Sequence, residues 1–353
     1  MNFEEFKKQL MEDIPERISS DSKVIVEENN VDKLQNESYQ GIVVRKEGDP
    51  IGVTLNAQTM YEHMDFNDVS YEEMLSNAVD IVQRGFEQTP DIDVANLTNY
   101  EVMKEHLVMQ VVPTDGNEGM LSNIPHKEME DMSIVYRFEM DSDEQGHATI
   151  LVTNAMLDRF EITPEQLHQD AQDFAPINEP AVIQNMAEVL AEMMGPEMAD
   201  MMPDDAMPMF VASVPNRFQG AGILAYPDFM EQAKKQMGGD FFVLPSSLHE
   251  VILLPDNGEM DRTALEEMVQ EVNATQVEPE DRLSDHVYHY DSEAKVFELA
   301  EKFDAKQAAK EATLESKTEK GSVLKELGEK QKEIADRLPK PKNMQKGTPE
   351  VAL

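Results

Sequence analysis

A hydroxyl, an imidazole and a carboxylate occur within five residues of this chain, in the segment Ser-Ser-Leu-His-Glu at 246–250. Ser247, His249 and Glu250 carry the kinds of group with which serine hydrolases attack a carbonyl. The members of such a triad usually come from distant segments, and no G-x-S-x-G elbow surrounds these serines. A hydrolase would therefore use His249 and Glu250 in a cleft with a distant residue such as Asp285.

The same segment also fits a turn between two buried strands, and this is the interpretation that we favour. Pro245 would end the first strand and Val251 would begin the second. Ser247 and Glu250 have the spacing of a capping box, in which each side chain accepts a hydrogen bond from the backbone N–H of the other residue. Leu253 stands where the zinc-protease motif H-E-x-x-H needs its second histidine, so that motif is absent.

A second cluster of metal-ligating residue types lies at 284–291, Ser-Asp-His-Val-Tyr-His-Tyr-Asp. Alternate side chains of a β-strand point to the same side, so Asp285, His289 and Asp291 would share one face of a strand here. His286 would point to the opposite face, and the two histidines would not bind one ion. We favour a hairpin strand with exposed polar ends, and we expect neither a metal ion nor another cofactor.

Methionine is concentrated between residues 186 and 209, where eight occur. Val182, Met186 and Val189 recur at helical spacing, which predicts a helix that ends at Gly195. The remainder predicts a loop whose adaptable apolar side chains pack in the core or line a groove for a partner. Binding of Cu(I) by the soft thioether groups is a third alternative.

The charge of the chain is strongly acidic and unevenly distributed. The chain has 353 residues, with 30 Lys and Arg against 71 Asp and Glu. The last 53 residues hold 12 basic and 10 acidic side chains, so the first 300 hold 18 and 61, a net charge of −43. Such a body repels nucleic acid and anionic membrane and attracts basic proteins.

Two further absences narrow the functional classes. The chain contains no cysteine, which excludes disulfides, thiolate nucleophiles and zinc sites that use cysteine. No apolar run approaches the length of a membrane span, and the charged N-terminus has no apolar leader segment. We therefore expect a cytoplasmic protein without a membrane partner.

The arrangement of short apolar runs predicts an α+β fold. Five segments read as a β-hairpin followed by a helix, which predicts mainly antiparallel sheets covered by helices. The third segment, 207–239, predicts strand, turn, strand and helix, with Gly220 and Gly222 at the start of its second strand. The five segments are 40–64, 132–160, 207–239, 241–272 and 286–303.

Three parts of the chain are expected from these elements. They are an N-terminal α+β subdomain at 1–120, a second α+β subdomain at 121–303, and a charged helical or disordered tail at 304–353. The tail has almost no aromatic or β-branched residues, so it lacks the side chains that would build a core.

Residues 220–255 and 271–291 resemble a bacterial family known as the domain of unknown function 5688. The resemblance extends over roughly residues 1–300, and the segments that carry it best are 244–250, 273–276 and 283–285. It implies a bacterial cytosolic protein, of a family frequent in Firmicutes and often encoded among mobile-element genes. It implies no activity.

The sequence therefore predicts a non-enzymatic cytosolic interaction protein whose acidic surface engages a basic partner. The net charge of the body and the lack of a strong catalytic motif support this prediction. The alternative is the hydrolase that would use His249 and Glu250 together with Asp285.

Overall fold

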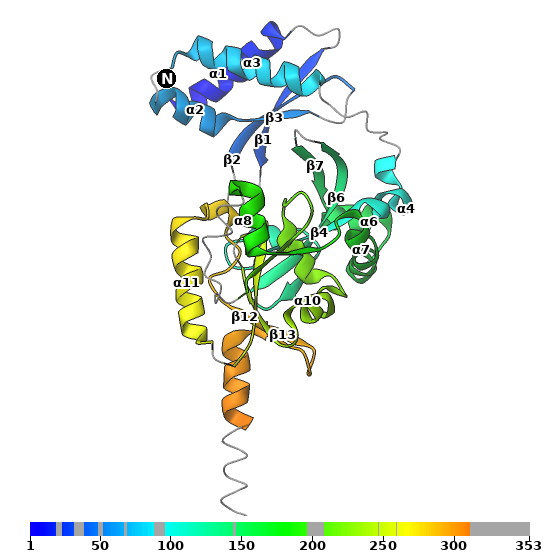
Figure 1. The fold of residues 1–353 in the computed structure, drawn as a ribbon. Coiled ribbons are helices and arrows are strands. Elements are labelled where there is room, and N and C mark those ends of the chain that lie inside the picture. The colour runs from blue at the N-terminus through cyan, green and yellow to red at the C-terminus, as the bar shows by residue number, and fades with distance from the viewer. Residues whose placement is uncertain are drawn as a thin grey trace, which may run out of the picture. The chain divides into compact units, whose positions relative to one another are not determined.

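The structure is a computed structural model, and it describes residues 1–18, 23–31, 39–48, 52–66, 69–87, 96–143, 146–195, 208–245, 247–258 and 260–310. The chain divides into two compact units, Met1–Ala300 and Glu301–Leu353. The first unit contains three antiparallel sheets with helices packed on them (Figure 1), which confirms the predicted α+β class. In the second unit, residues 301–310 are described and are helical.

Residues 3–87 form a module with a core of its own, which we call the N-terminal module. Its elements are α1 (Phe3–Arg17), β1 (Val24–Val31), β2 (Tyr39–Lys46), β3 (Val53–Asn56), α2 (Ala57–Phe66) and α3 (Tyr71–Glu87). Phe6, Leu10 and Ile14 recur at helical spacing on α1, and all three are buried against Ile42 of β2 and Leu55 of β3. This apolar stripe is what fixes α1 on the sheet.

A four-stranded sheet follows in the chain. Its strands are β4 (Leu107–Pro113), β5 (His126–Met129), β6 (Met132–Asp143) and β7 (Gly146–Leu151), and β6 pairs with the other three. The helix α7 (Pro164–Asn178) packs on β4, and Thr163 caps its N-terminus, because the Thr163 Oγ1 accepts a hydrogen bond from the Gln166 N–H. The boundary expected at residue 120 falls between β4 and β6, which pair with each other.

Short helices precede β4, join β4 to β5 and follow β7. They are η2 (Asn96–Thr98), α4 (Tyr100–Met103), η3 (Lys104–His106), α5 (Glu118–Leu121) and α6 (Asn154–Phe160). Thr153 caps α6, because its hydroxyl accepts from the Met156 N–H at 3.3 Å.

A six-stranded antiparallel sheet forms the rest of the first unit. In spatial order its strands are β13 (Val296–Leu299), β12 (Tyr288–Asp291), β10 (Phe241–Leu244), β11 (Val251–Pro255), β9 (Phe210–Ser213) and β8 (Val182–Asn185). Its helices are α8 (Met186–Met194), η4 (Gly220–Ala225), α10 (Phe229–Met237), α11 (Arg262–Thr275) and η5 (Pro279–Asp281).

The two faces of this sheet belong to two different apolar cores, because successive side chains of a strand point to opposite sides. On one face, which we call the core face, Val251 and Leu253 join a large core with η4, α10 and the four-stranded sheet. On the other, which we call the α11 face, Ile252 and Leu254 pack with residues of α8 and α11, including Val269.

Two predicted elements are wrong. The second strand expected in 207–239 is the 3-10 helix η4, in which Gly220 and Gly222 are buried. A Cβ on Gly222 would lie 2.0 Å from the Met109 carbonyl oxygen, so close packing, and not strand pairing, decides the conformation here. Val182 belongs to strand β8, and the helix predicted around it begins only at Met186, where Asn185 provides the cap.

The remaining hairpins agree with the prediction. β10, β11 and α11 follow one another as expected, and so do β12, β13 and the helix at 300–310. Among the described residues, every helix is too short or too polar to cross a bilayer.

Candidate functional site

The segment that links β10 to β11 is a turn, as the proline and the flanking apolar runs predict. Leu244 lies opposite Ile252 in the antiparallel pair. The Ser247 N–H donates to the backbone carbonyl of Glu250 at 3.2 Å, and the Ser247 hydroxyl accepts from the His249 N–H at 3.0 Å. The predicted capping box is therefore replaced by a backbone turn, which leaves the Glu250 carboxylate free to point elsewhere. Ser246 lies outside the described residues.

Both ring nitrogens of His249 are occupied. Nδ1 accepts a hydrogen bond from the Gln219 N–H at 3.1 Å, so a neutral ring carries its proton on Nε2. Nε2 lies 3.1 Å from Oδ1 of Asp281, to which it donates. The Phe218 ring packs beside the imidazole, with 5.8 Å between the ring centroids. These contacts hold the ring in place and leave neither nitrogen to take a proton from a serine.

The residues of the hydrolase alternative do not form a triad in the structure. The carboxylate that is hydrogen-bonded to His249 is that of Asp281. Asp285 instead accepts a hydrogen bond from Nδ2 of Asn273 at 2.8 Å. Ser247 is buried, and its hydroxyl is bonded to the His249 backbone. A nucleophile needs a base nitrogen within hydrogen-bond reach, and this arrangement offers none to Ser247.

The three metal-ligand candidates are held by different partners. The His289 ring is fully buried on β12, and its Nε2 lies 3.0 Å from Oδ2 of Asp256. Asp291 caps the turn after β12, where its Oδ1 accepts from the N–H groups of Glu293 and Ala294. Within the described part of the chain, no three His, Cys, Asp or Glu side chains gather as a metal ion requires.

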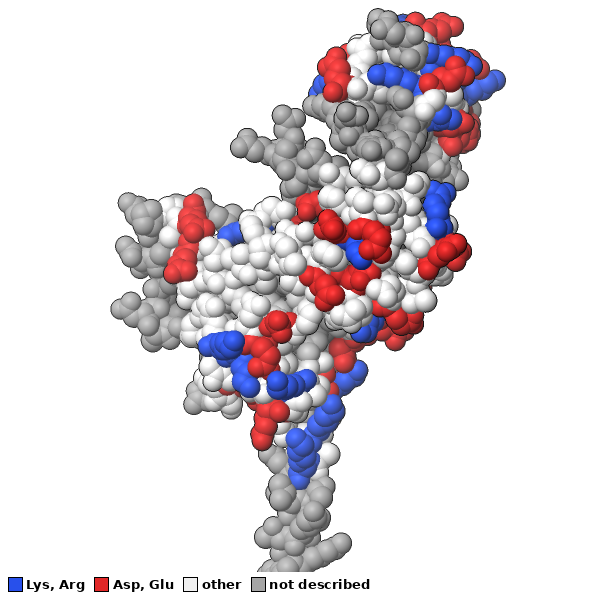
Figure 2. Space-filling view, turned by 90° about the vertical axis from the view of Figure 1, so that its right-hand side faces the viewer, with Lys and Arg blue, Asp and Glu red and all other residues white. Residues whose placement is uncertain are grey.

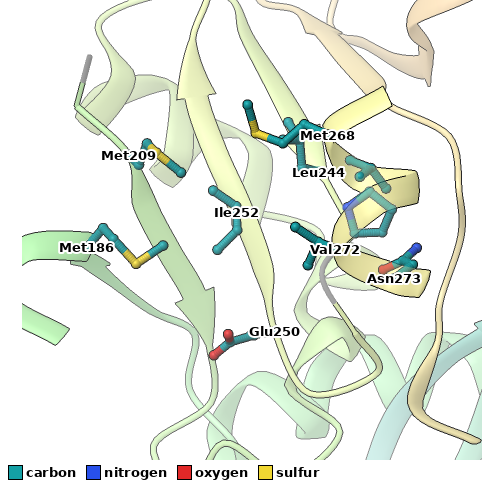
Figure 3. A pocket seen from close by; sticks show the side chains of 10 residues that line it. Met186, Met209, Leu244, Glu250, Ile252, Met268, Val272 and Asn273 are labelled. Atoms are coloured by element: carbon teal, nitrogen blue, oxygen red, sulfur yellow. The ribbon is translucent and has the colours of Figure 1, made fainter. Parts of the chain in front are cut away.

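An apolar pocket of about 220 Å³ lies between α11 and the α11 face of the sheet (Figure 3). In Figure 3, Ile252 stands between two methionines, Met186 and Met209, and the α11 residues Met268 and Val272. Ten side chains line the pocket: Met186, Met209, Leu244, Pro245, Glu250, Ile252, Met268, Val269, Val272 and Asn273. Met268 and Val272 are 48% and 37% exposed, so the pocket has a rim that solvent and ligands can reach.

Of the ten described side chains that line the pocket, two are polar, and both present hydrogen-bond acceptors. Among the described residues, no donor or cation contacts the half-buried Glu250 carboxylate. Asn273 is 2% exposed, and its Nδ2 donates to the Ser284 carbonyl at 2.9 Å and to Asp285 at 2.8 Å. The Asn273 Oδ1 is buried and has no hydrogen-bond partner in the described part of the chain. A buried acceptor without a donor costs free energy, which a bound donor would recover.

The methionine cluster contributes two residues to this pocket. Met186 begins α8 and Met209 precedes β9, and both are half-buried. Met268 lies across the pocket from them in Figure 3, so the three thioethers are distributed around its wall. This distribution is typical of adaptable apolar packing. Met198, Met201, Met202 and Met207 lie outside the described residues.

The structure also contains a polar cluster that the sequence did not indicate, formed by Lys127, His168 and Tyr136. Lys127 Nζ lies 2.9 Å from Nε2 of His168, and Nδ1 of His168 lies 2.9 Å from the Tyr136 hydroxyl. An ammonium group can only donate, so Nε2 accepts and Nδ1 carries the proton. Burial, together with the nearby Lys127, lowers the pKa of His168, and burial raises the pKa of Tyr136. Nothing local signals this cluster, because its residues come from β5, α7 and β6.

Asn273 and Asp281 were also missed as site residues, although Asn273 had a signal. It continues the row of Leu265 and Val269 at a spacing of four residues, so it occupies a core position of an amphipathic helix. A polar residue in such a row indicates a buried hydrogen bond or a binding site. Asp281 reaches His249 only because η5 folds back on the β10–β11 turn, where the Leu248 N–H donates to the Asp281 carbonyl.

The family comparison agrees with this architecture. The model of a family of unknown function, DUF5688, matches residues 3–292, so the chain belongs to that family. The match includes the N-terminal module, the four-stranded sheet, every strand of the six-stranded sheet except β13, and the pocket residues. No curated protein and no solved structure matches the chain.

Proposed function

We propose that this protein is a non-enzymatic cytosolic interaction protein whose acidic surface engages a basic partner. The segment 256–285 is the observation that carries the proposal. It holds ten acidic and two basic residues, and it forms α11, η5 and the approach to β12. A bacterial cytoplasm and an association with mobile-element genes belong to the same proposal.

Both arginines of this segment donate hydrogen bonds to other residues of the same segment. Arg262 donates to Glu266 at 2.7 Å, and Arg282 donates to the Val277 carbonyl at 3.3 Å. Glu267 and Glu271 are exposed on α11, and no cation among the described residues pairs with them. These carboxylates are four residues apart on one helix, so a cation of a partner can approach both.

The opposite side of the first unit also carries more acidic than basic side chains. Figure 2 shows groups of red Asp and Glu side chains over the middle of the body, with fewer blue Lys and Arg side chains among them. A field of this sign favours association with basic proteins and opposes binding to polyanions, so direct nucleic-acid binding is not part of the proposal.

The test compares two pairs of glutamates that have the same chemistry. Glu267→Gln/Glu271→Gln removes two charges from α11, and Glu12→Gln/Glu16→Gln removes two exposed charges, also four residues apart, from α1. The wild type and both variants are used to capture proteins from the host cytosol at about 0.1 M and about 1 M salt, where the Debye length falls from about 10 Å to about 3 Å.

The proposal predicts one basic partner that is retained at low salt and lost at high salt. The α11 variant is expected to bind the purified partner with an about fivefold higher Kd, and the α1 variant should bind like the wild type. The proposal is wrong if binding is unchanged at 1 M salt, or if the two variants lose affinity equally.

A further inference from the structure

We propose that the pocket beneath α11 binds a small molecule that combines a short apolar chain with a protonated amine. This inference goes beyond the proposed function and does not depend on it, because it concerns the inside of the pocket and not the acidic surface. The chemistry follows from the lining residues, taken in two groups.

The apolar lining residues determine the apolar chain of the ligand. Eight of the ten lining side chains are apolar, and three of these are methionines, which adapt their shape to a bound chain. The volume of about 220 Å³ suits a ligand of several heavy atoms, since an apolar cavity of about 150 Å³ holds benzene. A hard metal ion takes six or more oxygen ligands, and among the described lining residues only Glu250 and Asn273 carry side-chain oxygens.

The two polar lining residues determine the polar head group of the ligand. The Glu250 carboxylate and the Asn273 Oδ1 are both acceptors, and neither has a donor among the described residues. The oxygen assignment of Asn273 is fixed by its contacts, because the Ser284 carbonyl and the Asp285 carboxylate both require the NH₂ group on their side. In Figure 3, Glu250 lies below Ile252 on the sheet side of the pocket, and Asn273 lies on α11 beside Val272.

The two acceptors distinguish an amine from other head groups. An ammonium group has three donors and no acceptor, so it can donate to the Glu250 carboxylate or to the Asn273 Oδ1, and at Glu250 it also neutralises the charge. A hydroxyl has one donor and leaves the charge of Glu250 unpaired. A carboxylate head would be repelled by Glu250.

The experiment uses three probes with the same six-carbon chain, n-hexylamine, 1-hexanol and hexanoate. Each is titrated into the full-length protein labelled with ¹³C at the methionine methyl groups, and binding is followed by NMR. Replacement of Met186, Met209 and Met268 by leucine, one at a time, assigns the three pocket signals. Met74, buried in the core of the N-terminal module, gives a signal that should not move.

We expect hexylamine to shift the three pocket methyl signals and to bind about tenfold more tightly than hexanol. Hexanoate should bind most weakly. Glu250→Gln should reduce the affinity for hexylamine to that for hexanol and leave hexanol binding unchanged, which shows that the pocket is still folded. Glu267→Gln, an exposed residue next to Met268 that does not line the pocket, is the matched control and should change nothing.

Three results would overturn the inference. Equal affinities for the amine and the alcohol would remove the role of the acceptors, and so would a Glu250→Gln variant that binds hexylamine normally. Methyl shifts outside the pocket would place the site elsewhere. Nα-acetyl-lysine N-methylamide is added as a fourth probe, because a lysine side chain shares this chemistry. If it binds and hexylamine does not, the pocket takes a lysine of a protein partner and not a small molecule.

Discussion

On the core face of the six-stranded sheet, η4 lies so close to β4 that a Cβ on Gly222 would come within 2.0 Å of the Met109 carbonyl oxygen. On the α11 face of the same sheet, methionines and two helices leave a pocket of about 220 Å³. The strands are common to both faces, so the covering elements make the difference. Dense packing fixes one side of the sheet, whereas flexible side chains and two acceptors without a donor among the described residues line the other side.

The largest effect should come from neighbouring leucines of β11 that point to opposite faces. Leu253 packs in the large core and Leu254 packs under α11, and both are buried. We expect Leu253→Ala to lower the free energy of unfolding by about 4 kcal/mol, and Leu254→Ala by about 2 kcal/mol, because the methionine-lined side can collapse around the lost volume. Urea denaturation of both variants measures the difference, and equal losses would remove the contrast between the faces.

Gly222→Ala should have the next largest effect, about 3 kcal/mol, since the added methyl group meets backbone atoms that cannot rotate away. Gly239→Ala is the control, because a Cβ there has no atom within 4 Å. The same denaturation measurement applies. If both variants unfold like the wild type, η4 is not packed as closely on β4 as described.

The smallest expected effect is a pH dependence of the folding stability that arises from His168 on α7. Burial and Lys127 lower its pKa in the folded protein below the ordinary value of 6.5. Between pH 6.5 and the lower pKa of the folded state, His168 binds a proton more readily in the unfolded chain than in the folded protein. The free energy of unfolding should therefore fall as the pH is lowered through this range. His168→Gln cannot titrate and should lose less stability between pH 7 and pH 5.5 in thermal melts. A variant that follows the wild-type pH curve would contradict this assignment.

Local patterns were sufficient for much of the fold. The spacing of Phe6, Leu10 and Ile14 predicts α1, and Thr163 with Pro164 predicts the start of α7, because these signals depend on neighbours in the sequence. The 3-10 helix at 220–225 could not be predicted in this way. Its conformation depends on the approach of Met109 and Ser213 from other strands.

The candidate site was predicted only in part. Glu250 was singled out for its place beside His249, but its carboxylate belongs to a pocket that five separate segments assemble. The partner of His249 is Asp281 and not Asp285, and only the fold of η5 onto the turn decides between them. Such choices rest on long-range contacts, which residue types and spacing do not specify.

The contrast between the two faces can be tested most directly by the rate at which hydrogen peroxide oxidises each methionine of the folded protein, measured by mass spectrometry of its peptides. Met186, Met209 and Met268 line the pocket, whereas Met109 and Met132 are 2% and 0% exposed in the large core. Oxidation follows access of the oxidant to sulfur, so the pocket methionines should react at least about tenfold faster. Equal rates for the two groups would contradict an open α11 face and the binding role that we assign to it.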